Sequence, residues 1–278
     1  MSELSKRANT ALIFVTTMVL GILGGAYTFL ILFMLVTAFC LWEFHYIVLA
    51  HEKRRDIARN VIALCLGIAP FIIAALINLQ WVAPSLDFII STTLIFITLL
   101  FLVFLFELFT ESSRPFENIA FVMLGIVYIG LPFSLLCFAA FKDGGYQPEI
   151  VLSLLVINWM NDSAAYVAGS RFGKTPLFPR ISPKKTWEGS IGGLLGGVIA
   201  GLLFYLFTDI FQVTEWLILV IIIKVFGDLG DLTESMLKRS FGIKDSGTLL
   251  PGHGGFLDRF DAFIFLLPFA TLYIILCC

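Results

Sequence analysis

Long apolar runs separated by short polar breaks dominate this sequence of 278 residues. Most runs have about the 17 to 25 residues that an α-helix needs to cross the roughly 30 Å hydrocarbon core of a bilayer. Because a helix satisfies its backbone hydrogen bonds internally, such runs predict membrane-spanning helices. We expect about nine transmembrane helices, near residues 11–24, 26–46, 60–79, 88–109, 119–141, 150–169, 189–207, 213–230 and 262–277.

The composition agrees with this pattern. Hydrophobic residues make up 59% of the chain and charged residues only 14%, whereas soluble domains carry roughly a quarter charged residues. The predicted fold class is therefore an all-α polytopic membrane protein. The formal net charge of -2 offers no basic excess for nucleic acid. The 5 cysteines fall in apolar runs, without the spacing of a zinc site or a disulfide framework.

The distribution of basic residues predicts the orientation of the spans. With a cytoplasmic N-terminus, all but two of the 18 Lys and Arg residues lie in cytoplasmic segments, the exceptions being Lys142 and Lys224. Cytoplasmic loops carry such an excess of basic residues, so we expect this orientation. Two long loops, 170–188 and 231–261, then share the cytoplasmic side. The cluster HEKRRDIAR, residues 51–59, is interpreted as a loop that contacts anionic headgroups.

Two polar stretches stand out in the second half. NWMNDSAAYVAGSRFGK, residues 158–174, places Asp162 inside an apolar run. A carboxylate there costs on the order of 3 kcal/mol, which favours a role in a polar cavity over a helix-packing hydrogen bond. PRISPKKTWEGS, residues 179–190, places Lys184 and Lys185 near a predicted helix N-terminus. This arrangement suits a polyphosphate, and ordinary cytoplasmic charge is an equal alternative.

The richest polar stretch is KVFGDLGDLTESMLKRSFGIKDSGTLLPGHGGFLDRFD, residues 224–261. Asp228 and Asp231 are three residues apart, as are Asp258 and Asp261, so on a helix each pair shares a face. Mg²⁺ takes carboxylate and phosphate oxygens together, which makes two such pairs at a membrane surface a candidate metal site.

Basic and glycine residues surround these carboxylates. Four cations able to hold phosphate groups are close in sequence: Lys238, Arg239, Lys244 and Arg259. PGHGG supplies backbone freedom and exposed amides, and its His253 is assigned a turn-stabilising or phosphate-bonding role rather than that of a nucleophile. The combination predicts metal-assisted transfer at phosphorus. The chain has no G-x-S-x-G, H-E-x-x-H or Walker loop, which argues against a membrane protease or an ATPase.

SMLKRSFGIKDSGTLLPGHGGFLDRFD, residues 235–261, resembles the signature of the phosphatidate cytidylyltransferases, also called CDP-diacylglycerol synthases. NDSAAY, ISPKKTWEG and GDLTES resemble further blocks of that family, in order, from about residue 158. The N-terminal half resembles the family only as a set of spans. The resemblance implies Mg²⁺-dependent synthesis of CDP-diacylglycerol and pyrophosphate from CTP and phosphatidic acid, in phospholipid biosynthesis. It also implies an integral enzyme of the bacterial cytoplasmic (inner) membrane.

The resemblance implies a role for each matching residue. Asp231, Asp258 and Asp261 are expected to bind the metal and, with Lys244, to be catalytic, while Asp228 is an auxiliary metal ligand. Substrate binding is expected from Asp162, Lys184, Lys185, Lys238, Arg239, His253 and Arg259. Lys224 is expected to pair with one of the carboxylates or to reach the cytoplasmic edge. On this interpretation residues 1–118 are scaffold spans and residues 119–278 form the catalytic region.

Several alternatives stay open at this stage. An ion-coupled transporter would use Asp162, Lys224 and Asp228 as an ion path, but the polar residues collect at the cytoplasmic end rather than at mid-bilayer. A lipid kinase and a CDP-alcohol phosphotransferase are closer rivals, although the D-G-x-x-A-R block of the latter is absent. The sequence also leaves open a second, monovalent ion and a homodimer.

Overall fold

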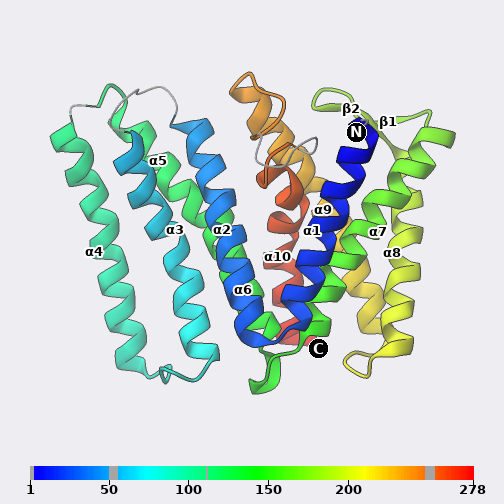
Figure 1. The fold of residues 1–278 in the computed structure, drawn as a ribbon, viewed down its shortest axis with the longest axis horizontal. Coiled ribbons are helices and arrows are strands. Elements are labelled where there is room, and N and C mark those ends of the chain that lie inside the picture. The colour runs from blue at the N-terminus through cyan, green and yellow to red at the C-terminus, as the bar shows by residue number, and fades with distance from the viewer. Residues whose placement is uncertain (1–2, 50–55, 111, 248–253) are drawn as a thin grey trace. The chain divides into compact units, whose positions relative to one another are not determined.

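The computed structural model describes residues 3–49, 56–110, 112–247 and 254–278, and they are almost entirely helical (Figure 1). In chain order the elements are α1 (Glu3–Leu23), α2 (Ala26–Val48), α3 (Asp56–Asn78), α4 (Leu86–Thr110), α5 (Pro115–Gly125), the π-helix η1 (Ile126–Gly130), α6 (Leu131–Ala140), the 3₁₀-helix η2 (Lys142–Gly144), α7 (Pro148–Phe172), β1 (Pro176–Phe178), β2 (Ser182–Thr186), α8 (Trp187–Phe207), α9 (Val213–Ser240) and α10 (Leu257–Cys277).

The predicted apolar runs all fall on helices, and the predicted all-α class is confirmed. The run 119–141 corresponds to the joined helices α5, η1 and α6. Among the described residues, 7 helical segments are long and apolar enough to cross a membrane, and α1 and α9 are not among them. The chain is therefore a multi-pass membrane protein. The count of nine spans and the orientation stay predictions.

Two compact units divide the chain. Unit 1 comprises Met1–Phe138 and Ser246–Leu257, and unit 2 comprises Ala139–Asp245 and Asp258–Cys278. The chain thus leaves unit 2 for a short stretch before α10 and returns to it at the second residue of that helix.

Unit 1 holds a buried ion pair between helices. Arg59 of α3 donates to Glu107 of α4, and both side chains are 1% exposed. Asn118 of α5 donates to the same carboxylate at 3.1 Å. The predicted contact of Arg59 with lipid headgroups is therefore wrong, because the buried Glu107 carboxylate requires a cation beside it. Residues 51–55 of the same cluster lie outside the described residues.

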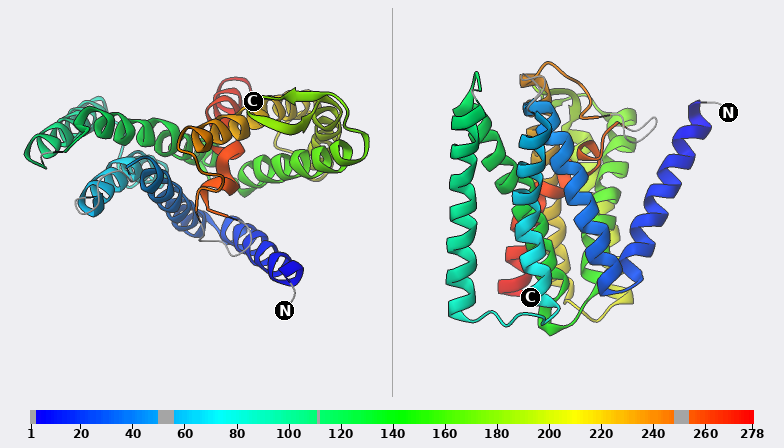
Figure 2. Two further views of the ribbon diagram at one scale, coloured as in Figure 1. Left: turned by 90° about the horizontal axis from the view of Figure 1, so that it is seen from above. Right: turned by 60° about the vertical axis from the view of Figure 1, so that its left-hand side comes forward.

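Small residues bring α7 and α8 together in unit 2, and the two helices lie side by side in the views of Figures 1 and 2. A Cβ added at Gly193 or Gly196 of α8 would come within 3.0 Å of the α7 backbone. Such close approach is the usual way in which helices pack in membranes, where small residues replace hydrophobic burial as the driving force. An aromatic pair joins α9 to α10, since the rings of Phe226 and Phe269 stack at 3.5 Å.

The two predicted long loops differ from the structure in extent. Residues 231–240 are the last turns of α9, because Leu232 and Glu234 are buried on that helix. The helix ends at Ser240, and Gly242, two residues later, has a φ of +69° that suits a glycine after a helix C-terminus. The loop predicted at 170–188 contains the hairpin β1–β2, which the sequence did not predict because its strands have only 3 and 5 residues.

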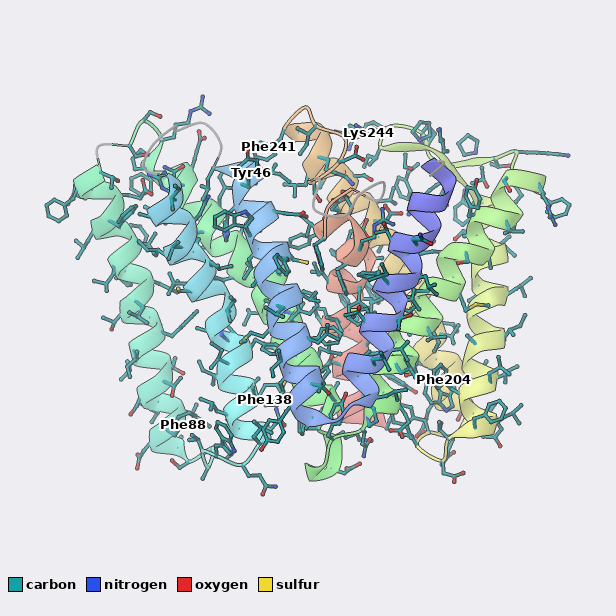
Figure 3. All side chains as sticks on the ribbon, in the orientation of Figure 1. Tyr46, Phe88, Phe138, Phe204, Phe241 and Lys244 are labelled. Carbon is teal, nitrogen blue, oxygen red and sulfur yellow. The ribbon has the colours of Figure 1, made fainter. Side chains whose placement is uncertain are left out.

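One end of unit 2 collects its polar segments. Figure 1 shows the hairpin and the C-terminal end of α9 at the same end of this unit. Lys244, which follows α9, lies at this end in Figure 3, whereas Phe204 of α8 lies at the opposite end. We call this polar end the hairpin end.

Candidate active site

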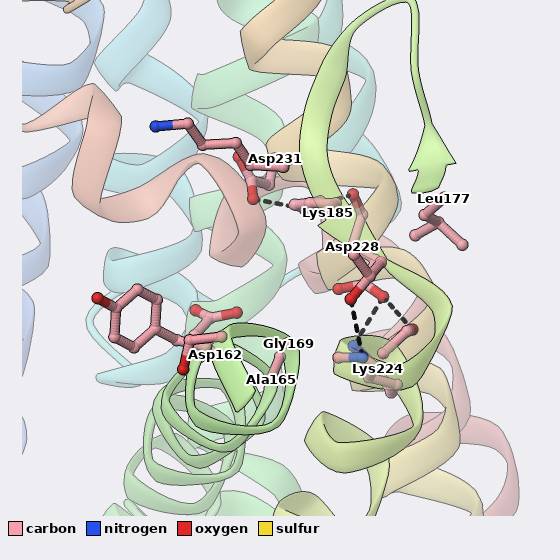
Figure 4. Close-up of a pocket in the computed structure, with 14 residues that line it drawn as sticks. Asp162, Ala165, Gly169, Leu177, Lys185, Lys224, Asp228 and Asp231 are labelled. Carbon is pink, nitrogen blue, oxygen red and sulfur yellow. Dashed lines mark hydrogen bonds and ion pairs between the residues drawn. The ribbon is translucent and has the colours of Figure 1, made fainter. Parts of the chain in front are cut away.

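A cavity of about 460 Å³ lies within unit 2 (Figure 4). This volume is in the range of roughly 300 to 1,000 Å³ that is typical of small-molecule sites. The charged and hydroxyl side chains that line it are Asp162, Tyr166, Ser170, Lys184, Lys185, Thr186, Ser190, Lys224, Asp228 and Asp231. The fold therefore brings together residues from three blocks that are far apart in the sequence.

The two lysines of the second block lie directly before α8. Lys184 is exposed and Lys185 half-buried on β2, and the helix begins at Trp187. Thr186 caps it, since the amide of Gly189 donates to Thr186 Oγ1 at 3.1 Å. The predicted helix N-terminus beside the lysine pair is thereby confirmed. Its free amides and dipole favour a bound anion such as a phosphate.

Lysines hold the two carboxylates of α9 that line the cavity. Lys185 Nζ lies 2.5 Å from Asp231, as the dashed line in Figure 4 shows. Lys224 Nζ donates to Asp228 Oδ2 at 2.7 Å, and Ser190 Oγ donates to the same oxygen at 2.9 Å. The predicted pairing of Lys224 with a carboxylate is confirmed. Asp228 has two side-chain donors from the protein, which supports its predicted auxiliary role.

A second cluster links α9 to the start of α10. Lys238 Nζ contacts both Glu234 and Asp258, the latter at 2.7 Å. The Glu234 side chain is fully buried. Burial by itself lowers the pKa of Lys238, but its hydrogen bonds to Asp258 and Glu234 outweigh this effect and raise the pKa. Lys238 therefore links α9 to α10 through its charge. This structural role goes beyond the phosphate binding that the sequence predicted.

Three carboxylates from different helices interact through their charges. Asp261 of α10 is half-buried, and the charges of Asp231 on α9 and Asp162 on α7 act on it. The approach of α10 to α9 is close here, since a Cβ at Gly230 would lie 2.9 Å from the Asp261 carbonyl oxygen. Like charges gathered in this way are stabilised by a cation.

The donor types fit Mg²⁺ that arrives with a phosphate. Within the described ranges, no group of three or more His, Cys, Asp or Glu side chains has the arrangement of a metal site. Mg²⁺, however, commonly takes only one or two protein carboxylates and completes its shell with substrate phosphate oxygens and water. Asp231 and Asp261 supply carboxylates of this kind from two helices.

Some predicted site residues do not line the cavity. Arg239, Lys244 and Arg259 are exposed, and Arg239 Nη1 donates to the carbonyl oxygen of Ile243 at 3.2 Å. His253 lies outside the described residues. Conversely, sequence reasoning missed Glu234, although its spacing of four residues from Lys238 on a helix is typical of an ion pair.

Comparison with known proteins gives a consistent result. The model of the Cytidylyltransferase family matches residues 5–277, so the similarity includes the N-terminal half and confirms the family resemblance. Proteins named phosphatidate cytidylyltransferase from Staphylococcus saprophyticus, Staphylococcus haemolyticus and Staphylococcus aureus are 42%, 44% and 42% identical over 168 residues. That alignment covers 60% of this chain and 63% of each relative's length.

Proposed function

The chain belongs to the cytidylyltransferase family, and from this premise we propose that it transfers CMP from CTP to phosphatidic acid, with CDP-diacylglycerol and pyrophosphate as products. One observation carries the proposal: a cavity at the polar end of unit 2 in which Asp162, Asp228 and Asp231 face lysines beside a helix N-terminus. The name of the relatives at 42% to 44% identity supports the choice of substrates.

The cavity suggests how the triphosphate is bound. Lys184 and Lys185, with the N-terminus of α8, supply cations and backbone amides for its oxygens. A phosphatidate oxygen forms a bond to the α-phosphorus of CTP, and the bond from that phosphorus to the bridging oxygen breaks. The electron pair leaves with pyrophosphate. Because the attacking phosphate oxygen is already ionised, the step requires neither a general base nor a covalent enzyme intermediate.

We assign the metal chiefly to Asp231 and Asp261, with Asp162 nearby. Mg²⁺ bound here would neutralise charge on the phosphates and polarise the reacting phosphorus. Asp258 is held by Lys238, and Asp228 by Lys224 and Ser190, so both orient the site from its edge.

The proposal includes a location. Lys244 and the two lysines of β2 lie at the hairpin end of unit 2, which supports a cytoplasmic location for this end, where CTP is available. Phosphatidic acid then reaches the cavity from the inner leaflet of the bacterial cytoplasmic membrane. Its acyl chains stay in lipid.

An assay with purified full-length protein tests the function. With Mg²⁺, CTP and phosphatidic acid in mixed micelles, we expect CDP-diacylglycerol and an equal amount of pyrophosphate. ATP in place of CTP is expected to be a poor donor. The control omits phosphatidic acid and should release no pyrophosphate. Equal use of ATP with a phosphorylated lipid as product would show a lipid kinase and overturn the proposal.

The neighbouring lysines provide a second test. Lys185 pairs with Asp231 and donates to the Asp228 carbonyl oxygen at 3.4 Å, whereas Lys184 is exposed at the cavity rim. We expect Lys185→Ala to lower kcat/KM by about a hundredfold and Lys184→Ala by about tenfold or less, since each change removes one phosphate contact but only the first frees a carboxylate. Initial rates over a range of CTP concentrations measure this. Equal losses for the two variants would contradict the assignment.

A further inference from the structure

Glu43 of α2 is a buried carboxylate that the proposed mechanism does not use. Its side chain lies within a predicted membrane span and is 3% exposed. Charged groups at such positions are costly and are retained where they face specific partners. The partners of Glu43 in unit 1 belong to the stretch 246–257, which contains much of the signature.

Contacts to Glu43 come from both sides of this stretch. Ser246 Oγ donates to Glu43 Oε2 at 3.1 Å, and the Leu257 amide donates to the same oxygen at 2.9 Å. Gly247 and Gly255 lie against the carboxylate so closely that a Cβ at either would overlap it. One oxygen atom thus connects two points that are 11 residues apart along the chain.

The contact with Leu257 is also a helix cap. Leu257 is the first residue of α10, and the first amides of a helix have no partner within it. An anion at this end is stabilised by the free amides and by the helix dipole. Glu43, a residue of α2, therefore caps the N-terminus of α10. The next residue along the chain is Asp258, and Asp261 follows one turn later.

We propose that Glu43 is a positioning residue for the reaction: by holding Ser246 and the Leu257 amide it determines where α10 begins and so where its two aspartates lie. The inference rests on the proposed function only for its activity assay.

Kinetics and amide exchange test the proposal in the full-length protein in nanodiscs. We expect Glu43→Ala to lower kcat by about tenfold or more while KM for CTP changes by less than about threefold, because the cavity lining does not include Glu43. Hydrogen exchange of the Leu257 amide should accelerate. Glu43→Gln should retain most of the turnover, because its amide oxygen can still accept both hydrogen bonds.

A double-mutant cycle separates positioning from general destabilisation. Ser246→Ala should have little further effect in the Glu43→Ala background, since its bond is already lost. Glu107→Gln is the matched control, a buried carboxylate of α4 that pairs with Arg59, and it should lower the melting temperature without changing kcat of the folded protein. Where Glu43→Ala does not fold, Gly255→Ala tests the same contact from the loop.

The outcomes are distinguishable. Wild-type protein without cytidylyltransferase activity would overturn the proposed function, while amide exchange would still report on the Glu43 contact. An active wild type with unchanged kcat in Glu43→Ala would overturn the positioning role. A loss of kcat in Glu43→Ala without faster exchange of the Leu257 amide would also overturn it. The same conclusion would follow if the kcat losses of Glu43→Ala and Ser246→Ala multiplied in the double variant.

Discussion

Asp231→Asn is expected to lower turnover by at least about a thousandfold, because it removes charge from the centre of the site without changing the shape of the side chain. Asp231 is the carboxylate that interacts with several other charged groups of the site. Lys185 pairs with it, and its charge acts on both Asp162 and Asp261. The variant should still insert and fold, since the Asp231 side chain is 38% exposed and asparagine can still accept a hydrogen bond from Lys185.

Turnover at saturating CTP and phosphatidic acid, over a range of Mg²⁺ concentrations, measures the effect. Asp209→Asn is the matched control, because Asp209 lines a separate cavity of unit 2 with Tyr205 and Gln212 and should tolerate the change. If Asp231→Asn retains more than about a tenth of the activity, the metal assignment is wrong. Recovery of the variant at high Mg²⁺ would instead identify Asp231 as one of several ligands.

The helices were predictable because bilayer thickness sets their length. Runs of about 20 apolar residues have few other stable structures in a membrane, so each predicted span falls on a helix, although α1 begins at Glu3, before the predicted start at 11. Where polar residues follow an apolar run the prediction was poorer. The helix α9 continues ten residues past the predicted end at 230, because one of its faces is still buried there, through its residues Leu232 and Glu234.

The candidate site was predictable as a set of residues but only in part as a set of pairs. Spacing placed Asp228 and Asp231 on one helix face, and both line the cavity. The pair of Lys224 and Asp228 has the four-residue spacing of a helical ion pair, whereas the partner of Lys185 depends on how β2 packs against α9, which no local pattern encodes. The result is that Lys185 is distinguished from Lys184 only in three dimensions.

The most informative omission concerns buried charges in the first half. The rule that led to Asp162, that a charged residue in an apolar span has a specific partner, applies equally to Glu43 and Glu107. Applied to Glu43 and Glu107, the rule predicts that each carboxylate has a polar partner but does not identify that partner. Arg59 looked like a loop cation because it follows a basic cluster, yet it is the partner of Glu107.

Lys238 raises a question that its sequence context cannot answer, because two roles would produce the same loss of activity. The resemblance implies that Lys238 binds a substrate phosphate, whereas in the structure Lys238 forms ion pairs with buried Glu234 and with Asp258. Lys238→Met should lower the free energy of unfolding by about 3 kcal/mol or more, since it leaves Glu234 buried without a cation. Lost activity in this variant alone would therefore not distinguish a structural role from a catalytic one.

A second substitution separates the two roles. Glu234→Gln combined with Lys238→Met removes both buried charges, so we expect the melting temperature to return close to the wild-type value. Turnover should nevertheless stay about a hundredfold low, because Asp258 has lost the ammonium group that orients it. Arg239→Met, an exposed neighbour on α9, controls for loss of surface charge and should affect stability little. If turnover returns together with stability, Lys238 serves the fold alone, and the phosphates of CTP must be held by the lysines before α8.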